Sequence, residues 1–196
     1  MTLDMSQRLF SLLPALFSLA LFLGAGLLFI VELMIAKMIL PLLGGTPAVW
    51  NTCMMFFQAM LLVGYAYAHM VSRKAGVARQ IILHLAVFLA ACIVLPIALP
   101  RDWLPPVEGS PIGYILLLLL VSLGLPFFVL SVNSVLLQRW FADTGHPSAK
   151  DPYFLYSASN LGSMLGLISY PTLIEPYFRL AQQSRIWALG YVILLA

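Results

Sequence analysis

The chain has 196 residues, of which 62% are hydrophobic and 9% are charged, and its mean hydropathy is +1.01. A soluble domain carries about 25% charged residues, so this composition excludes an ordinary soluble domain. The net charge of +3 is spread over several segments and forms no basic patch, so nucleic acid is not an expected partner.

Apolar runs recur along the chain at the length of about 20 residues that an α-helix needs to cross about 30 Å of hydrocarbon. They are continuous, whereas the strands of a membrane β-barrel alternate with a period of two. The sequence therefore predicts an all-α, polytopic membrane helix bundle. We expect one transmembrane domain, 1–196, with about six spans and the lipid bilayer as its surroundings.

The first predicted span covers about 12–40. The N-terminus before it has one basic residue and no convincing cleavage site, which favours a first membrane helix over a removed signal peptide. Gly24 and Gly26 predict a bend or a close neighbouring helix in its middle. We expect Pro41 to end the span.

The second predicted span, about 47–71, opens with Thr46 and Pro47. A hydroxyl at the N-cap and a proline in the first helical turn are typical of a helix start. A short basic loop then leads into a third span at about 80–99.

The fourth span is expected at about 111–141, with a kink at Pro126, and the fifth at about 152–170, broken by Pro171. The last apolar run, 184–196, is too short to cross a bilayer. We therefore expect the sixth span to be incomplete and the chain to continue beyond its last residue.

The distribution of basic residues predicts the orientation of the bundle. Cytoplasmic loops of membrane proteins carry an excess of lysine and arginine, which here favours a cytoplasmic N-terminus in a multi-pass protein of the bacterial inner membrane. One set of span ends holds Arg8, Arg73, Lys74, Arg79, Arg139 and Lys150, and the other holds Lys37, Arg101, Arg179 and Arg185.

Two charges, Glu32 and Lys37, lie within the first span. Five residues separate their side chains by about 140° around a helix, so they are not placed to bond each other as an i,i+4 pair would be. Lys37 is close enough to the span end to reach the interface. Glu32 lies deeper, and an ionisable group there predicts either a substrate or proton site or a structural partner for a polar residue of another helix.

Polar side chains on other spans extend this hypothesis to a tentative substrate-binding set of Glu32, Gln58, Asn133 and Asn160 around a cavity at the membrane midplane. The alternative is that the amides only form hydrogen bonds between helices. Gly162 and Gly166 form a small-xxx-small motif, which predicts close helix packing within the chain.

Histidine and cysteine give no metal-binding pattern. His69 and His84 flank the same basic loop, but no third ligand or spacing motif accompanies them. Cys53 and Cys92 lie in apolar segments, which is typical of small core residues. We expect no metal and no cofactor.

Two segments resemble a known family: GGTPAVWNTCMMFFQAMLLVGYAYAH (44–69) and LLQRWFADTGHPSAKDPYFLYSASNLGSMLGLISYPTLIEP (136–176). Both are similar to the N-terminal membrane region of the bacterial fused transporter/spermidine-synthase-like proteins. The resemblance implies a major-facilitator-like half bundle that precedes an aminopropyltransferase-type domain in the fused proteins. The glycine-rich turn and acidic residues of such a synthase domain are absent from this sequence.

These observations leave two functional hypotheses. The first is a transporter-like membrane domain that moves or senses a small solute, such as a polyamine cation. The second is an accessory or structural subunit that packs against a larger membrane-protein complex, which the missing synthase domain favours. An enzyme is not expected, because the sequence shows no nucleophile–base pair, metal cluster or phosphate-binding loop.

Overall fold

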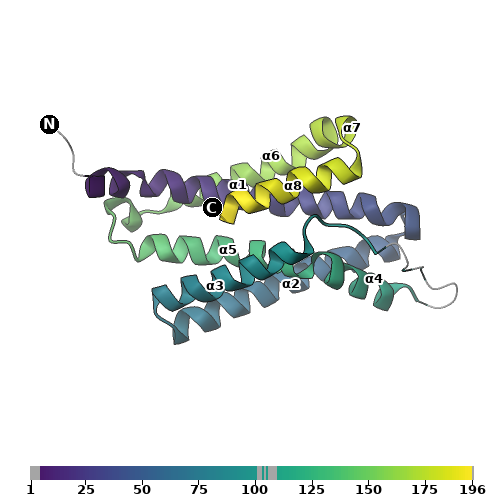
Figure 1. Cartoon of the computed structure of the whole chain (residues 1–196), viewed down its shortest axis with the longest axis horizontal. Coiled ribbons are helices and arrows are strands. Elements are labelled where there is room, and N and C mark those ends of the chain that lie inside the picture. Colours follow the sequence, from purple (N-terminus) through teal and green to yellow (C-terminus); the bar gives the residue numbers. More distant parts are fainter. Residues whose placement is uncertain (1–4, 101–102, 104, 106–109, 196) are drawn as a thin grey trace.

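The computed structural model describes residues 5–100, 103, 105 and 110–195. Regular structure within these residues is entirely helical, and the long helices run roughly along one axis of an elongated bundle (Figure 1). The predicted all-α bundle is therefore confirmed. Four of the described helical segments are long and apolar enough to cross a membrane: Phe10–Leu43, Pro47–Lys74, Val77–Val94 and Ile112–Ala142.

The first half of the chain forms three helices. The second half forms a series of helices that short π-helical segments interrupt. The first half contains α1 (Met5–Leu43), α2 (Pro47–Lys74) and α3 (Val77–Ala91), which ends in the 3-10 turn Cys92–Val94. The second half contains α4 (Ile112–Leu119), α5 (Leu125–Ala142), α6 (Tyr153–Ser169), α7 (Glu175–Tyr177) and α8 (Leu180–Leu195).

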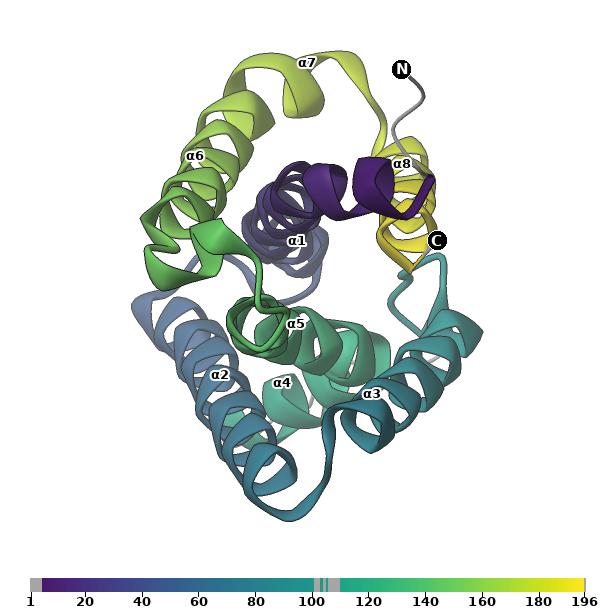
Figure 2. The same ribbon diagram turned by 90° about the vertical axis from the view of Figure 1, so that its left-hand side faces the viewer.

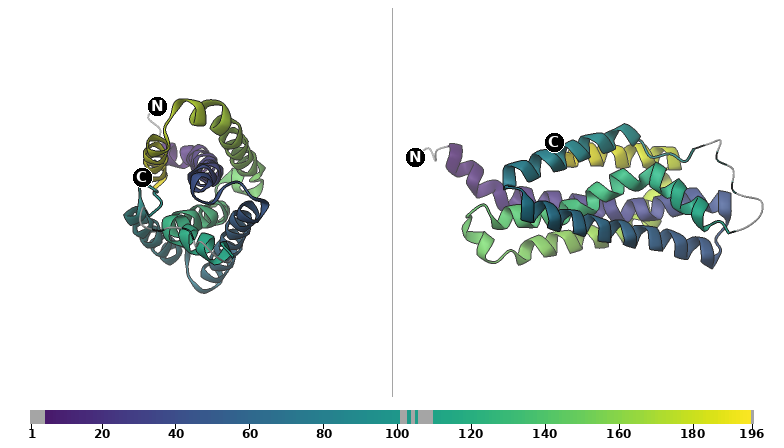
Figure 3. Two further views of the ribbon diagram at one scale, coloured as in Figure 1. Left: turned by 90° about the vertical axis from the view of Figure 1, so that its right-hand side faces the viewer. Right: turned by 90° about the horizontal axis from the view of Figure 1, so that it is seen from below.

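The two halves interlock. The long first helix, α1, packs mainly against α6, α5 and α8, whereas α5 packs against α2 and α3 as well as α1. The end-on views show α1 and α5 in the middle of the bundle, with the other long helices around them (Figures 2 and 3). Each half therefore supplies a central helix that is held largely by helices of the other half.

The core lies along these central helices, and the outer surface is apolar. Val31, Met34 and Ile35 of α1 are fully buried, as is Phe127 of α5. Large apolar side chains such as Leu62, Ile82 and Leu189 are exposed on the outer helices. An apolar exterior around a packed core is what a bundle surrounded by lipid requires, because lipid does not penalise exposed hydrocarbon.

Glycines bring α1 and α6 into backbone contact. A Cβ atom at Gly162 would lie 2.1 Å from the carbonyl oxygen of Phe22, and one at Gly166 would lie 2.9 Å from that of Gly26. The small-xxx-small pair thus lies against α1, and Gly26 is the close-approach point on the α1 side.

Prolines end fewer helices than the sequence predicts. The fifth span does not end at Pro171. The chain stays helical through the π-helical segment Tyr170–Ile174 and continues into α7. Proline lacks an amide hydrogen and its ring crowds the carbonyl four residues earlier. The wider coil of a π segment relieves that crowding. A second π segment, Leu120–Gly124, comes directly before α5, which carries Pro126 in its first turn.

Other helix ends shift by a few residues. Pro41 lies within the last turn of α1, which ends at Leu43 and is followed by Gly44 with a φ of +71°. The left-handed conformation at Gly44 is the usual way for glycine to terminate a helix. The third span stops at Val94 rather than near residue 99, because Pro96 disfavours helix in the residue before it.

The α1–α6 contact gives a stability prediction. We expect Gly162→Ala to lower the free energy of unfolding by about 1–3 kcal/mol, because the added methyl group overlaps a backbone oxygen that cannot move freely. The unfolding midpoint of the purified protein in detergent measures this change.

Gly113→Ala is the matched control, since nothing lies within 4 Å of a Cβ atom at that helical position. It should leave stability unchanged or raise it slightly, because alanine has the higher helix propensity. Equal midpoints for the two variants would contradict the close contact between α1 and α6.

Candidate functional site

A cavity of about 320 Å³ lies between α1, α2, α5 and α6, and is called the central cavity below. Its walls combine apolar side chains with polar groups from all four helices. The polar lining residues are Glu32, Gln58, Tyr65, Ser131, Asn133, Ser134, Ser159 and Ser163. Two of these helices belong to the first half of the chain and two to the second, so the cavity lies where the halves meet.

Three of the four residues in the predicted substrate-binding set line this cavity: Glu32, Gln58 and Asn133. Their role in binding a substrate stays a prediction. Asn160 does not line the cavity and is exposed, whereas Ser159 and Ser163 provide the polar surface of α6. At about 100° per residue, Asn160 is rotated by about 160° from Gly162, so it faces away from α1 when Gly162 packs against that helix.

The serines and Tyr65 were not in the predicted set. Ser159 and Ser163 are four residues apart and therefore share one helix face, a spacing that is visible in the sequence. Ser131 and Ser134 are likewise on the face of α5 that carries Asn133. Small hydroxyl side chains are common in membrane helices, so this signal alone does not separate a cavity wall from a packing surface.

Two hydroxyl groups of the cavity already donate their hydrogen to the backbone. The Ser131 hydroxyl donates to the carbonyl of Phe128 at 2.7 Å, and the Ser163 hydroxyl donates to that of Ser159 at 3.0 Å. Their oxygens retain only acceptor capacity. The carboxylate of Glu32 is also an acceptor, so this part of the cavity is suited to a ligand that donates hydrogen bonds.

Glu32 is half-buried and is the charged residue of the central cavity. The salt bridge in the described part of the chain joins Lys37 to Glu175. Glu32 therefore has no basic partner in that part of the chain. A carboxylate at this depth in a membrane helix is costly unless it is paired, solvated or bound to a ligand. The arrangement therefore provides an acidic, acceptor-rich site between the two halves.

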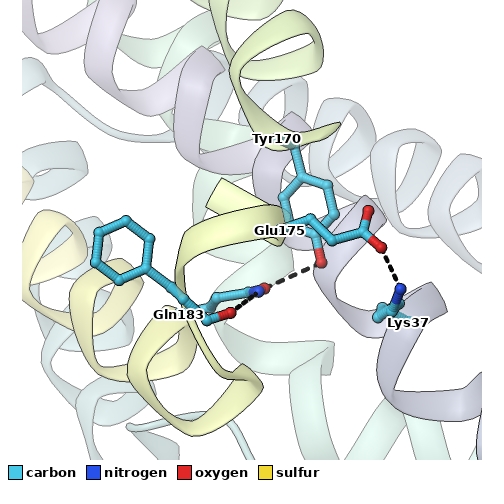
Figure 4. Close-up of polar contacts among 5 residues, drawn as sticks. Lys37, Tyr170, Glu175 and Gln183 are labelled. Atoms are coloured by element: carbon cyan, nitrogen blue, oxygen red, sulfur yellow. Dashed lines mark hydrogen bonds and ion pairs between the residues drawn. The ribbon is translucent and has the colours of Figure 1, made fainter. Parts of the chain in front are cut away.

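Lys37 has its partner on a different helix. Its ammonium group pairs with the carboxylate of Glu175 in α7, and the hydroxyl of Tyr170 donates to Gln183 at 3.0 Å nearby (Figure 4). The pair joins α1 to the second half of the chain. The sequence does not reveal Glu175 as the partner, because 138 residues separate it from Lys37.

A second cavity, of about 460 Å³, lies beside this ion pair. Apart from Lys37, Glu175 and Tyr170, its lining is apolar and includes Val49 and Leu167. Its charged groups are already paired with each other. The central cavity is the better candidate for a polar solute, because its carboxylate is unpaired and its polar groups are more numerous.

Histidines and cysteines are dispersed in the described part of the chain. No group of three or more histidine, cysteine or acidic residues that could hold a metal ion occurs there. His84 is buried in α3, whereas His69 is exposed on α2. Cys53 and Cys92 are both free thiols.

Comparison of the chain with protein-family models, curated proteins and solved structures finds no match. The resemblance of segments 44–69 and 136–176 to the fused transporter/spermidine-synthase-like proteins therefore stays an expectation. The candidate function therefore depends on the geometry of the central cavity.

The Lys37–Glu175 pair gives a second testable prediction. The two side chains are 43% and 35% exposed, and an exposed ion pair contributes less than about 1 kcal/mol. We expect Lys37→Glu and Glu175→Lys each to lower the unfolding midpoint slightly, because each places like charges together. The double variant should recover most of the loss in a thermal-unfolding assay.

Arg179→Glu combined with Glu175→Lys serves as the control, since Arg179 is exposed near the pair but is not its partner. Recovery of the midpoint in this combination as well would show that only net charge at this end of the bundle matters. That result would contradict a specific contact between Lys37 and Glu175.

Proposed function

We propose that this chain is a transporter-like membrane domain that binds a small cationic solute in the central cavity. The observation that carries the proposal is Glu32, a carboxylate in a membrane helix that lines a cavity and has no basic partner among the described residues. An ionisable residue in such a place is usually functional. A cation would supply the missing counter-charge.

The chemistry of the walls favours an organic ammonium ion. Gln58 and Asn133 provide amide oxygens, and the hydroxyls of Ser131 and Ser163 provide acceptor oxygens beside the carboxylate. An ammonium group is a donor only, so it matches this surface. Primary amines and polyamines are the solute class that we expect.

The position of the central cavity, between the two halves of the chain, favours transport or sensing of a solute over simple storage of it. Its volume is at the small end of the range of about 300–1,000 Å³ for ligand pockets, which suits a compact solute. It lies between helices of both halves of the chain. Small rotations of interlocked halves around a central site are the usual basis of alternating access.

A second candidate function, that of an accessory subunit, is favoured by the outer face of α6. Tyr156 and Asn160 are four residues apart and both are exposed there. An amide that faces lipid is unfavourable, so this face suits contact with another membrane protein. Replacing Asn160 with leucine should release such a partner during purification and leave amine binding unchanged.

We also propose that the domain lies in a bacterial inner membrane with its N-terminus in the cytoplasm. The turn at residues 75–76, between α2 and α3, lies at one end of the bundle, and the α7–α8 connection lies toward the other (Figure 1). Basic residues are more numerous around the first of these ends, which the positive-inside rule assigns to the cytoplasm.

Cysteine labelling tests this orientation. In a chain with Cys53 and Cys92 replaced by alanine, we expect a membrane-impermeant maleimide to label Arg179→Cys in intact cells. Gly76→Cys should be labelled only after the membrane is opened, because it lies on the cytoplasmic side. The reverse pattern would contradict the proposed orientation.

The central prediction concerns Glu32. We expect Glu32→Gln to weaken binding of spermidine and putrescine at least tenfold, about 1.4 kcal/mol, because the variant keeps the shape of the side chain but removes its charge. Equilibrium binding to protein in lipid nanodiscs measures the loss, and the unfolding midpoint checks that the fold is retained.

Asn160→Ala is the matched control outside the cavity and should bind like the unchanged protein. Asn133→Ala and Gln58→Ala should each weaken binding less than Glu32→Gln, because each removes a neutral hydrogen-bond acceptor. Unchanged amine binding in the Glu32→Gln variant would overturn the site, and no binding by the unchanged protein would overturn the function.

A further inference from the structure

The second cavity, of about 460 Å³, adjoins the central cavity and is called the apolar cavity below. Helices α1, α2 and α6 line both of them. On α1 the lining passes from Glu32 of the central cavity to Leu33 of the apolar cavity, and on α2 it passes from Met54 to Cys53. No described residue borders both, so they are two neighbouring cavities rather than one.

The lining residues follow one face of each helix from the central cavity into the apolar cavity. On α1, those of the central cavity lie within 21–32 and those of the apolar cavity within 33–40. Residues four apart in a helix share a face. On α2 and α6 this spacing continues from one cavity into the other, at Leu61, Phe57 and Cys53 and at Ser159, Ser163 and Leu167. The two cavities therefore lie end to end along these helices.

The two cavities differ in chemistry. The central cavity contains the carboxylate of Glu32, whereas the apolar cavity has largely hydrocarbon walls and its charged groups, Lys37 and Glu175, are paired with each other. Leu40, which also lines the apolar cavity, lies eight residues beyond Glu32, about 12 Å along α1. A carboxylate at one end of an elongated space with apolar walls matches an amphiphile with a cationic head.

The rim of the apolar cavity reaches the outer surface of the bundle. Leu40 on α1, Trp50 on α2 and Leu167 on α6 line this cavity and are exposed. Lipid tails are as apolar as leucine, so exposed side chains of this kind suit contact with the bilayer. An alkyl chain can therefore reach the cavity from the hydrocarbon of the bilayer without crossing water.

We propose that the preferred solute is an amphiphilic monoamine whose ammonium group binds beside Glu32 and whose alkyl chain occupies the apolar cavity. This assignment rests on the proposed function, because it requires amine binding in the central cavity. The central cavity holds the compact head of the solute, and the apolar cavity distinguishes a long chain from a short one. Because methionine side chains are flexible, the chain can pass Met54 at the junction of the two cavities.

A second charge on the chain opposes binding in this mode. The carboxylate of Glu175 is already paired with Lys37, so an ammonium group at the far end of the chain would lie against an apolar wall without a free partner. Moving an unpaired charge out of water is costly. Among long amines of equal length we therefore expect a monoamine to bind more tightly than a diamine.

The first experiment measures how affinity depends on chain length. Equilibrium dialysis against lipid nanodiscs, with protein-free nanodiscs as the blank, gives the dissociation constants of butylamine, hexylamine, octylamine and decylamine. We expect the constant to fall about two- to fourfold for each methylene group that the apolar cavity covers, from the free energy of burying a methylene group. The diamine with the chain of octylamine should bind about tenfold more weakly than octylamine.

Ala36→Phe tests the place of the chain, because Ala36 lines the apolar cavity and a phenyl ring there fills it. We expect this variant to bind butylamine like the parent and to lose most of the gain with chain length. Ala90→Phe is the matched control, since Ala90 is exposed on α3 and lines neither cavity. An equal gain with chain length in Ala36→Phe and in the parent would overturn the proposal, as would tighter binding of the diamine.

A fluorescence measurement on the parent does not depend on the folding of Ala36→Phe. Bromine quenches tryptophan on contact, and Trp50 lines the apolar cavity. Decylamine with bromine at the far end of its chain should quench Trp50, and excess butylamine should reverse this part of the quenching by competing at Glu32. Quenching from the bilayer is not reversed by butylamine, and Trp50→Phe should lack the reversible part. Absence of reversible quenching in the parent would overturn the proposal.

Butylamine separates the two kinds of failure. If it binds while chain length and bromine have no effect, this inference is wrong and the proposed function stands. If no amine binds, the proposed function is wrong and the assignment of an amphiphilic solute falls with it.

Discussion

In a bilayer, helices gain little from hiding apolar surface from one another, because lipid is as apolar as leucine, so close backbone packing must hold them together. In this bundle α1 and α6 come into such contact, where Gly162 and Gly166 face the backbone of Phe22 and Gly26. The contact sets the rotation of α6. Once Gly162 faces α1, Ser159 and Ser163 border the central cavity and Asn160 faces outward.

The same contact joins the two halves of the chain. Because α1 packs mainly against helices of the second half, and α5 packs against helices of the first, neither half is held by its own contacts alone. The central cavity lies between them, and the Lys37–Glu175 pair makes another connection. A site of this kind changes shape whenever the halves move relative to each other.

Unpaired polar groups in the interior give the bundle its chemical character. Glu32 has no basic partner among the described residues. Neither ring nitrogen of the buried His84 has a hydrogen-bond partner there. Such groups reduce stability, so their presence needs an explanation beyond packing. The proposed cationic solute would supply the counter-charge that the Glu32 carboxylate lacks.

Much of the architecture can be predicted from local sequence, because it depends on local physics. Long apolar runs indicate the spans, and Thr46 with Pro47 marks the start of α2, where the Thr46 hydroxyl accepts a hydrogen bond from the amide of Val49 at 3.4 Å. The cavity-lining positions of Glu32, Gln58 and Asn133 agree with the expectation that polar residues of separate spans gather in the interior.

The tertiary structure alone decided the rest. The partner of Lys37 lies 138 residues away, and no local pattern predicts a contact at that distance. The exposure of Asn160 depends on the rotation of α6 against α1, and the continuation of the helix through Pro171 depends on a π segment within the packed bundle. The sequence by itself determined which segments are helical and apolar, since those properties are local. Which faces meet was decided by backbone packing between helices far apart in the chain.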